Sequence, residues 1–214
     1  MLIPLKQSQL STLIPSVATA GQFKYAFGNP NKILQRILIS SIGGVITFLI
    51  SVSQDRNQTY SLWLILCVVF FLYILWGPIV EASLKNSSYK KFNYSALFEG
   101  RILDIYQKSK LESTVEQTDR QGKLRLIENR RTWLFLELED EDGYIGKLGF
   151  PYDQKHNSIR IGSQIRCIVF ASSKDFTREI TFSDAYLPKE NLWVGEYPSI
   201  LRPAFIELCS YFLR

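Results

Sequence analysis

Five carboxylates stand between residues 137 and 142, the densest group of side chains in this chain that could do chemistry. They are Glu137, Glu139, Asp140, Glu141 and Asp142. Carboxylate oxygens bind divalent cations such as Ca²⁺, but the ligand spacing of an EF-hand loop is missing here. We therefore favour a solvated turn between two strands over a metal site or the centre of a membrane-tethered enzyme.

Histidine and cysteine add little further chemistry. The single histidine, His156, stands in a polar loop, where a solvated side chain is the usual case. The three cysteines, Cys67, Cys167 and Cys209, are far apart and odd in number, so we expect buried thiols, not a zinc site or disulfides. The sequence has no phosphate-binding glycine loop, GxSxG elbow or HExxH motif. We predict a protein that is not an enzyme and that has no metal, no cofactor and no small-molecule substrate.

The elements that would position these residues begin with two long uncharged runs. Residues 37–54 contain no charged side chain, and after Asp55 and Arg56 a second such run covers residues 57–80. A helix needs about 20 apolar residues to cross a hydrocarbon core of about 30 Å. The sequence therefore predicts a hairpin of two transmembrane helices at residues 33–82 with a very short loop. For the first run, which contains serines and glycines, a buried or interfacial helix is the alternative.

Aromatic side chains mark the expected boundaries of the membrane. The arm at residues 1–32 carries aromatic residues next to Lys24 and Lys32, a mixture that suits the headgroup layer. We predict an amphipathic or interfacial arm. We also predict that six aromatic residues of this part of the chain lie at the membrane–water interface: Tyr25, Phe27, Tyr60, Trp63, Tyr73 and Trp76.

Positive charge is concentrated beside the predicted spans. Residues 1–80 carry five Lys and Arg against one Asp, whereas residues 81–214 carry 20 against 19 acidic residues. Lysine and arginine on both outer flanks of the hairpin predict that both termini and the following domain face the cytoplasm or the stroma. The location of the charge favours anionic lipid over nucleic acid as a partner.

The first run also contains small residues at close spacing. Gly43 and Gly44 lie among Ser40 and Thr47, and such patches let helices approach closely in lipid. Packing against the second helix of the same chain is the favoured interpretation, and contact with a partner's membrane helix is the alternative. Neither span contains an ionisable residue, which argues against proton or ion transport.

Residues 83–198 change to a period of two. Short β-favouring segments, of which Arg131–Leu138 is the strongest, alternate with turn signals at Asp119–Gly122 and Asp142-Gly143. We predict a small all-β domain, an OB-like or SH3-like barrel of about five to seven strands. Residues 199–214 follow as an amphipathic C-terminal helix, which would cover the open end of the barrel or dock on a partner.

Three segments resemble a family of cyanobacterial and plastid-lineage membrane proteins that is often labelled phosphate ABC transporter permease. They are Leu13–Thr19, Leu75–Pro78 and Asn191–Pro198, and the resemblance extends over the whole chain. The segment Gly21-Gln22-Phe23 departs from the Gly-Pro-Gln-Tyr of that family. The resemblance implies a thylakoid or plasma membrane protein connected with photosynthesis. Its plan would be similar to that of the photosystem I assembly factor called Ycf four.

We therefore expect a non-enzymatic integral membrane accessory or assembly factor. Its partners would be the lipid bilayer and subunits of a photosystem-type or cytochrome-type complex, bound through Gly43, Gly44, Trp193 and Tyr197. The alternative is a transporter subunit similar to a phosphate ABC permease. Two uncharged spans cannot enclose a polar path alone, so that alternative needs oligomers or partner subunits.

Overall fold

The computed structural model describes residues 1–28, 30–53, 58–118 and 124–213. The chain divides into two units, neither of which is continuous in sequence. The first unit joins residues 1–10 to residues 92–200, and the second joins residues 11–91 to residues 201–214. The short α1 (Gln7–Leu13) contains the point at which the chain passes from one unit to the other. The predicted loop at Asp55 and Arg56 and the predicted turn at Asp119–Gly122 lie outside the described residues.

The first unit is built on one antiparallel sheet of eight strands, ordered β4-β3-β2-β5-β7-β8, with β1 on β2 and β6 on β5. A 3₁₀ turn, η1 (Gln154–Ser158), precedes β5. The strands are β1 (Leu2–Pro4), β2 (Tyr94–Thr118), β3 (Leu124–Glu139), β4 (Ile145–Pro151), β5 (Gln164–Ala171), β6 (Thr181–Phe182), β7 (Ala185–Leu187) and β8 (Leu192–Val194).

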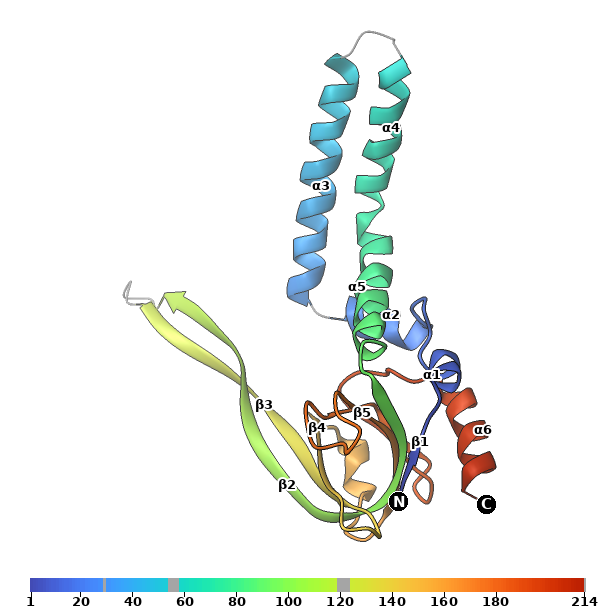
Figure 1. The fold of residues 1–214 in the computed structure, drawn as a ribbon. Coiled ribbons are helices and arrows are strands. Elements are labelled where there is room, and N and C mark those ends of the chain that lie inside the picture. Colours follow the sequence, from blue (N-terminus) through green and yellow to red (C-terminus); the bar gives the residue numbers. More distant parts are fainter. Residues whose placement is uncertain (29, 54–57, 119–123, 214) are drawn as a thin grey trace. The chain divides into compact units, whose positions relative to one another are not determined.

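The longest strand, β2, has 25 residues and belongs to two different parts of the sheet. Its first part, Tyr94–Arg101, pairs with β5, and the rest pairs with β3 alone. Because β3 pairs with β4 only from Trp133 onward, the far ends of β2 and β3 continue as a two-stranded ribbon that extends from the sheet (Figure 1). We call residues 109–118 and 124–132 the ribbon.

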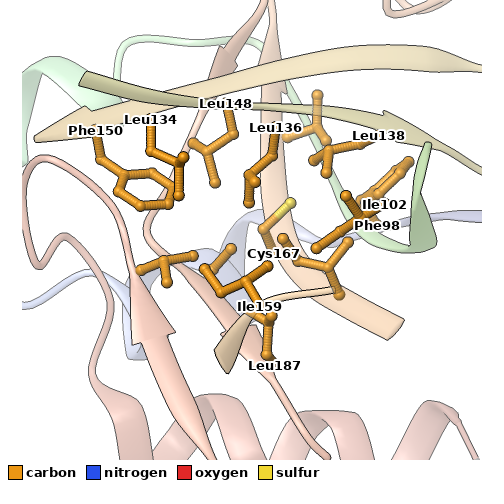
Figure 2. Close-up of a cluster of buried hydrophobic side chains, with 14 of the residues drawn as sticks. Phe98, Ile102, Leu134, Leu136, Leu138, Leu148, Phe150, Ile159, Cys167 and Leu187 are labelled. Atoms are coloured by element: carbon orange, nitrogen blue, oxygen red, sulfur yellow. The ribbon is translucent and has the colours of Figure 1, made fainter. Parts of the chain in front are cut away.

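The core of the first unit lies on one face of this sheet. Figure 2 shows the alternate residues Leu134, Leu136 and Leu138 of β3 pointing the same way, together with Leu148 and Phe150 of β4. This arrangement follows from the period of two along a strand. The fully buried side chains that join them from other strands include Phe98, Ile102, Ile165, Cys167 and Leu187.

The predicted small OB-like or SH3-like barrel is wrong, because the sheet is larger and its described path runs from β4 to β8 without a pairing between these two ends. Residues 97–106 and 111–118 belong to one long strand, β2, instead of two short ones. Register shifts at Ile102/Asp104 and Leu111/Ser113 interrupt the alternation, so that Ile105 returns to the core side after Ile102. In the sequence, the interrupted alternation looks like a break between two strands.

The second unit contains five helices among its described residues. α2 (Ala20–Phe27) begins with a capping box in which Thr19 and Gln22 exchange hydrogen bonds. α3 (Pro30–Ser53) and α4 (Gln58–Phe71) run side by side in opposite directions (Figure 1). α5 (Tyr73–Tyr89) follows α4 after a break at Leu72. The predicted C-terminal helix lies at α6 (Arg202–Phe212), with Pro203 in its first turn.

The predicted hairpin of two transmembrane helices is also wrong. Among the described residues only α3 is by itself long and apolar enough to cross a membrane. The second uncharged run is divided into α4 and α5, which meet at an angle of 71°, and it passes the same test only if the bent pair is taken as one span. The cause of this break is described below.

Candidate functional site

The faces of α3 have the polarity opposite to that of a helix in a water-soluble protein. Its buried residues recur every three or four positions and are small or polar: Arg36, Ser40, Gly44, Thr47 and Ser51. Its exposed residues are large and apolar, with 44% to 67% of their surface accessible: Leu34, Ile37, Leu38, Ile42, Val45, Ile46, Phe48, Leu49 and Val52. A helix packed on an aqueous protein buries its apolar stripe instead.

α4 shows the same inverted polarity as α3. Its only buried residue among those described is Cys67, whose thiol donates to the carbonyl of Gly44 at 3.4 Å. Its exposed residues are again large and apolar: Leu62, Ile65, Leu66, Val68, Val69 and Phe71. Both helices therefore present mainly large apolar side chains outward, whereas Ser40, Thr47 and Cys67 are buried.

Gly43 and Gly44 of α3 leave the room that two phenylalanine rings of α4 occupy. A Cβ added at Gly43 would lie 2.4 Å from the ring of Phe70, and one at Gly44 would lie 2.8 Å from the ring of Phe71. The two glycines thus form the surface on which the phenylalanine rings rest. Their predicted role in binding a partner stays a prediction, and the space that it needs is occupied by the same chain.

Ser40 explains where α4 ends. In a continuous helix the carbonyls of Phe70 and Phe71 would accept the amides four residues later. Here the hydroxyl of Ser40 lies 2.9 Å and 2.8 Å from these two oxygens, and its proton is shared between them. The amide of Leu75 donates to Leu72 instead, at 2.9 Å.

The remaining carbonyl at this break is also satisfied. The indole of Trp76 donates to the oxygen of Val69 at 2.9 Å, and its ring meets that of Tyr73 edge to face at 4.8 Å. Pro78 follows inside α5, where it supplies no amide donor. The helix end is therefore closed by protein donors, an arrangement suited to bending the chain and not to coordinating a mobile cation.

A charged cluster holds the end of α3 to α2 and α5. Arg36, 5% accessible in its side chain, lies 2.6 Å from one carboxylate oxygen of Glu81 and donates to the carbonyl of Ala26 at 3.2 Å. Lys32 pairs with the other oxygen of Glu81. Because its guanidinium has several donors in one plane, Arg36 can bind two helices at once.

Two buried amides join α2 to α5. The side chains of Gln22 and Asn86 are both fully buried and exchange hydrogen bonds of 2.9 Å and 3.1 Å. Asn86 also donates to the carbonyl of Pro15 at 3.0 Å. Since the polar atoms satisfy one another, the pair can be buried without a large cost.

The six predicted interfacial aromatic residues lie in three places. Tyr25 and Phe27 are on α2, and the ammonium group of Lys85 lies 5.0 Å from the ring centre of Tyr25. Tyr60 and Trp63 are half-buried near the start of α4, and Tyr73 and Trp76 stand in the first turn of α5. Tyr73 and Trp76 thus lie at the helix break. Their interfacial role is untested and stays a prediction.

Trp193 and Tyr197 belong to the first unit and are not close to the glycines in sequence. Trp193 is half-buried on β8, with its ring 5.0 Å from that of Tyr186. Tyr197 is only 4% accessible. A partner would therefore reach Trp193 more easily than Tyr197, and the partner-binding role of both stays a prediction.

The acidic cluster is divided by the fold. Asp140 is buried and accepts the amides of Asp142 and Tyr144 at 3.0 Å and 2.8 Å, which fixes the turn between β3 and β4. A cavity of about 420 Å³ borders this turn, lined by Glu99, Arg101 and Gln164 among others. Within the described part of the chain, no group of three or more His, Cys, Asp and Glu side chains is placed to hold a metal ion.

His156 is not the solvated side chain that its loop suggested. It is 7% accessible, its Nδ1 accepts the amide of Asp153 at 3.0 Å, and its ring packs edge to face on Phe150 at 4.8 Å. Burial, with a smaller contribution from Lys155, lowers the pKa of His156. These contacts make it a structural residue of η1.

Sequence analysis missed the polar contacts that hold the helices together. Arg36 and Glu81 stand just outside the two uncharged runs, at ends that an antiparallel pair brings together, so their opposite charges were an available signal. No such signal distinguished Gln22 and Asn86, because a buried amide pair follows from tertiary packing alone.

The model of a family of unknown function, DUF8619, matches this chain over residues 3–212. The match includes nearly all of both units. No curated protein and no solved structure matches the chain. The family carries no assigned activity, so a function has to be argued from the contacts described above.

Proposed function

Since the chain belongs to DUF8619, a family of unknown function, we propose from its own geometry that it is an integral membrane protein and a non-enzymatic accessory or assembly factor of a membrane protein complex. The observation that carries the proposal is the inverted polarity of α3, with Ser40, Gly44 and Thr47 buried and its leucine, isoleucine and valine side chains exposed. In water this surface would drive aggregation, whereas in a bilayer it is the expected lipid-facing surface.

The alternatives for an apolar helix are a core helix and a cleaved signal sequence. A core helix would be largely buried, but only 22% of the most apolar part of α3 is buried. Removal of α3 as part of a signal sequence would take away the Arg36 contacts to Ala26 and Glu81 and the surface on which Phe70 and Phe71 rest. Both observations support retention of α3 in the membrane.

The orientation of the anchor is proposed from its flanking charges. Lys24, Lys32 and Arg36 precede the apolar part of α3, and Lys85 and Lys90 stand toward the end of α5. Lysine and arginine near membrane segments favour the cytoplasmic side. We place both termini and the sheet on the cytoplasmic or stromal side of a plasma or thylakoid membrane, an arrangement in which the bent pair of α4 and α5 returns the chain to the side from which α3 starts.

The ribbon is the feature that suits an accessory factor. Between Ser109 and Thr118, β2 is paired on one edge only, and β3 is likewise paired on one edge before Trp133. Such free edges and an extended surface are available to a partner chain, because strand addition needs no pocket. We therefore assign partner binding to the ribbon, in addition to the residues predicted from the sequence.

A photosystem-type or cytochrome-type partner is supported by the sequence resemblance alone. A permease subunit is the second candidate, and one observation weakens it. The carbonyls freed at the break between α4 and α5 are occupied by Ser40 and Trp76, whereas a transport path would leave such carbonyls open to its substrate.

The experiment combines alkaline carbonate extraction of native membranes with purification of a tagged protein in mild detergent. The test variant replaces residues 112–129 by Asn-Gly, since Leu111 and Arg130 face each other and this dipeptide closes a tight hairpin. The matched control is the double substitution Lys155→Gln and Lys174→Gln, at two exposed sites of the same unit.

We expect all three proteins to stay in the membrane pellet and only the short-ribbon variant to lose its co-purifying subunits. Release of the wild type by carbonate would contradict the anchor. Recovery of the wild type without other subunits would contradict the accessory role. Recovery with transporter ATPase subunits would establish the second candidate instead.

A further inference from the structure

The face of the sheet opposite the core carries a row of three stacked aromatic rings. Tyr106 and Phe135 stand opposite each other on β2 and β3, with ring centres 5.5 Å apart and an angle of 16° between the rings. Trp133, two residues from Phe135 on the same face, continues the row at 6.4 Å. A Cβ at Gly149 of β4 would lie 2.6 Å from Phe135, so that ring lies directly against the neighbouring strand.

Three exposed lysines cover these rings. The ammonium group of Lys110 lies 4.2 Å from the centre of Trp133, and that of Lys108 lies 5.1 Å from Tyr106. Lys147 lies 4.8 Å from Tyr106 and 5.2 Å from Phe135. We call this surface the aromatic–lysine face: Tyr106, Lys108, Lys110, Trp133, Phe135 and Lys147.

The positive charge of the aromatic–lysine face is confined to a small area and is retained over the physiological pH range. A hydrogen bond to Tyr106, together with the nearby Glu137, raises the pKa of Lys147, so that this lysine stays cationic over the physiological range. Glu137 is the direct neighbour of Lys147 on β3 and limits the positive surface on that side. The rest of residues 81–214 is nearly neutral, so three ammonium groups on one face of the sheet stand out from their surroundings.

We propose that the aromatic–lysine face rests on the anionic headgroups of a bilayer. This inference rests on the proposed function, because the sheet is tethered to the anchored helices by a short connection: α5 ends at Tyr89 and β2 begins at Tyr94. Three lysines alone would bind a free protein to an anionic membrane only weakly. In an anchored protein the face is already tethered to the bilayer, so the contact needs no recruitment from solution. Lysine beside tryptophan and tyrosine is the composition of the headgroup layer.

Other anionic occupants fit less well. Single-stranded nucleic acid binds on exposed ring faces within a basic groove several nucleotides long. Here the lysines themselves lie over the rings, and Glu137 stands at the border of the face. Flexible cations on an exposed face of a sheet suit a layer of headgroups, which needs no fixed register.

The test measures amine acetylation of single lysines by mass spectrometry, with the full-length protein in lipid nanodiscs. One disc contains phosphatidylcholine alone, and the other contains phosphatidylcholine with phosphatidylglycerol. Lys155, Lys174 and Lys189 are the controls, since they are exposed on the same unit but away from the aromatic–lysine face. We expect the acetylation rates of Lys108, Lys110 and Lys147 to fall roughly threefold to tenfold in the anionic disc, and to recover in high salt.

Three outcomes separate the alternatives. Failure of the protein to enter either disc would overturn the anchor, and with it both proposals. Entry with equal acetylation of all six lysines in both discs would overturn only the lipid contact. Protection that needs a single-stranded oligonucleotide, added to phosphatidylcholine discs, would assign the face to nucleic acid and overturn the lipid assignment.

Discussion

The hydroxyl of Ser40 lies 2.8 Å from the carbonyl oxygen of Phe71, a residue of α4 that stands 31 positions later in the chain. This contact and the one to Phe70 replace hydrogen bonds that α4 would otherwise make with its own continuation. One small polar side chain on α3 thus meets both of the carbonyls that are freed where α4 ends.

Substitution Ser40→Ala should weaken the helical unit by about 1–3 kcal/mol, because two buried carbonyls lose their donor. The measurement is the thermal unfolding midpoint of the full chain in detergent, followed by circular dichroism. Ser53→Ala is the matched control, since the Ser53 hydroxyl is exposed and bonds only within its own helix. Equal midpoints for Ser40→Ala and the wild type would show that the break does not depend on Ser40.

Gly44→Ala should separate α3 from α4, since its Cβ would lie 2.8 Å from the Phe71 ring. We expect a loss of about 1–3 kcal/mol from overpacking. The second substitution Phe71→Leu should restore part of that loss, and a double-mutant cycle measures the coupling. Ile42→Ala, on the exposed face of α3, should change the midpoint little. Additive effects of Gly44→Ala and Phe71→Leu would contradict the contact.

Arg36→Gln should destabilise the chain more than Lys32→Gln does, although both lysine and arginine pair with Glu81. Arg36 is buried and also holds Ala26, whereas Lys32 and Glu81 are each close to half-exposed, so their pair is screened by solvent. We expect about 1–3 kcal/mol for Arg36→Gln and less than about 1 kcal/mol for Lys32→Gln. Chemical unfolding of both variants in the same detergent makes the comparison, and the reverse order would contradict it.

His156 should make the sheet less stable in mild acid. Its folded pKa is lowered by burial, so the unfolded chain binds a proton more readily than the folded chain. Stability is therefore complete above the unfolded pKa of about 6.5 and falls as the pH decreases through that value toward the folded pKa. Unfolding midpoints at pH 8 and pH 5 should differ less for His156→Asn, whose amide oxygen can still accept the Asp153 amide. An unchanged difference would exclude His156 as its source.

Some of these features follow from the sequence and others do not. The start of the C-terminal helix beside Pro203 and the hairpin of β3 and β4 at Asp142-Gly143 depend on local chemistry, and both stand where the pattern places them. The break at Leu72 has no proline or glycine next to it. It depends on Ser40, which is distant in sequence, so a local pattern predicts one uninterrupted helix.

The strands of the sheet could also be predicted only in part from local sequence patterns. A period of two is kept along β2 except at its two register shifts, and each shift exchanges the faces that follow it. The alternation therefore predicts short strands and a small barrel where one long strand exists. Similarly, Gly43 and Gly44 could be identified as a close-packing surface, but whether Phe70 or a partner occupies it is decided only by the fold.

The position of β1 has a consequence for the order of folding. Leu2 and Pro4 pair with Phe98 and Ala96, so this strand waits for a partner that is synthesised more than ninety residues later. At about 5–20 residues per second that delay is roughly 5–20 s. All of α3, α4 and α5 leaves the ribosome during this time. The apolar helices can therefore be inserted completely before β1 pairs with β2. A delay in insertion would prolong the time for which these two strands stay unpaired.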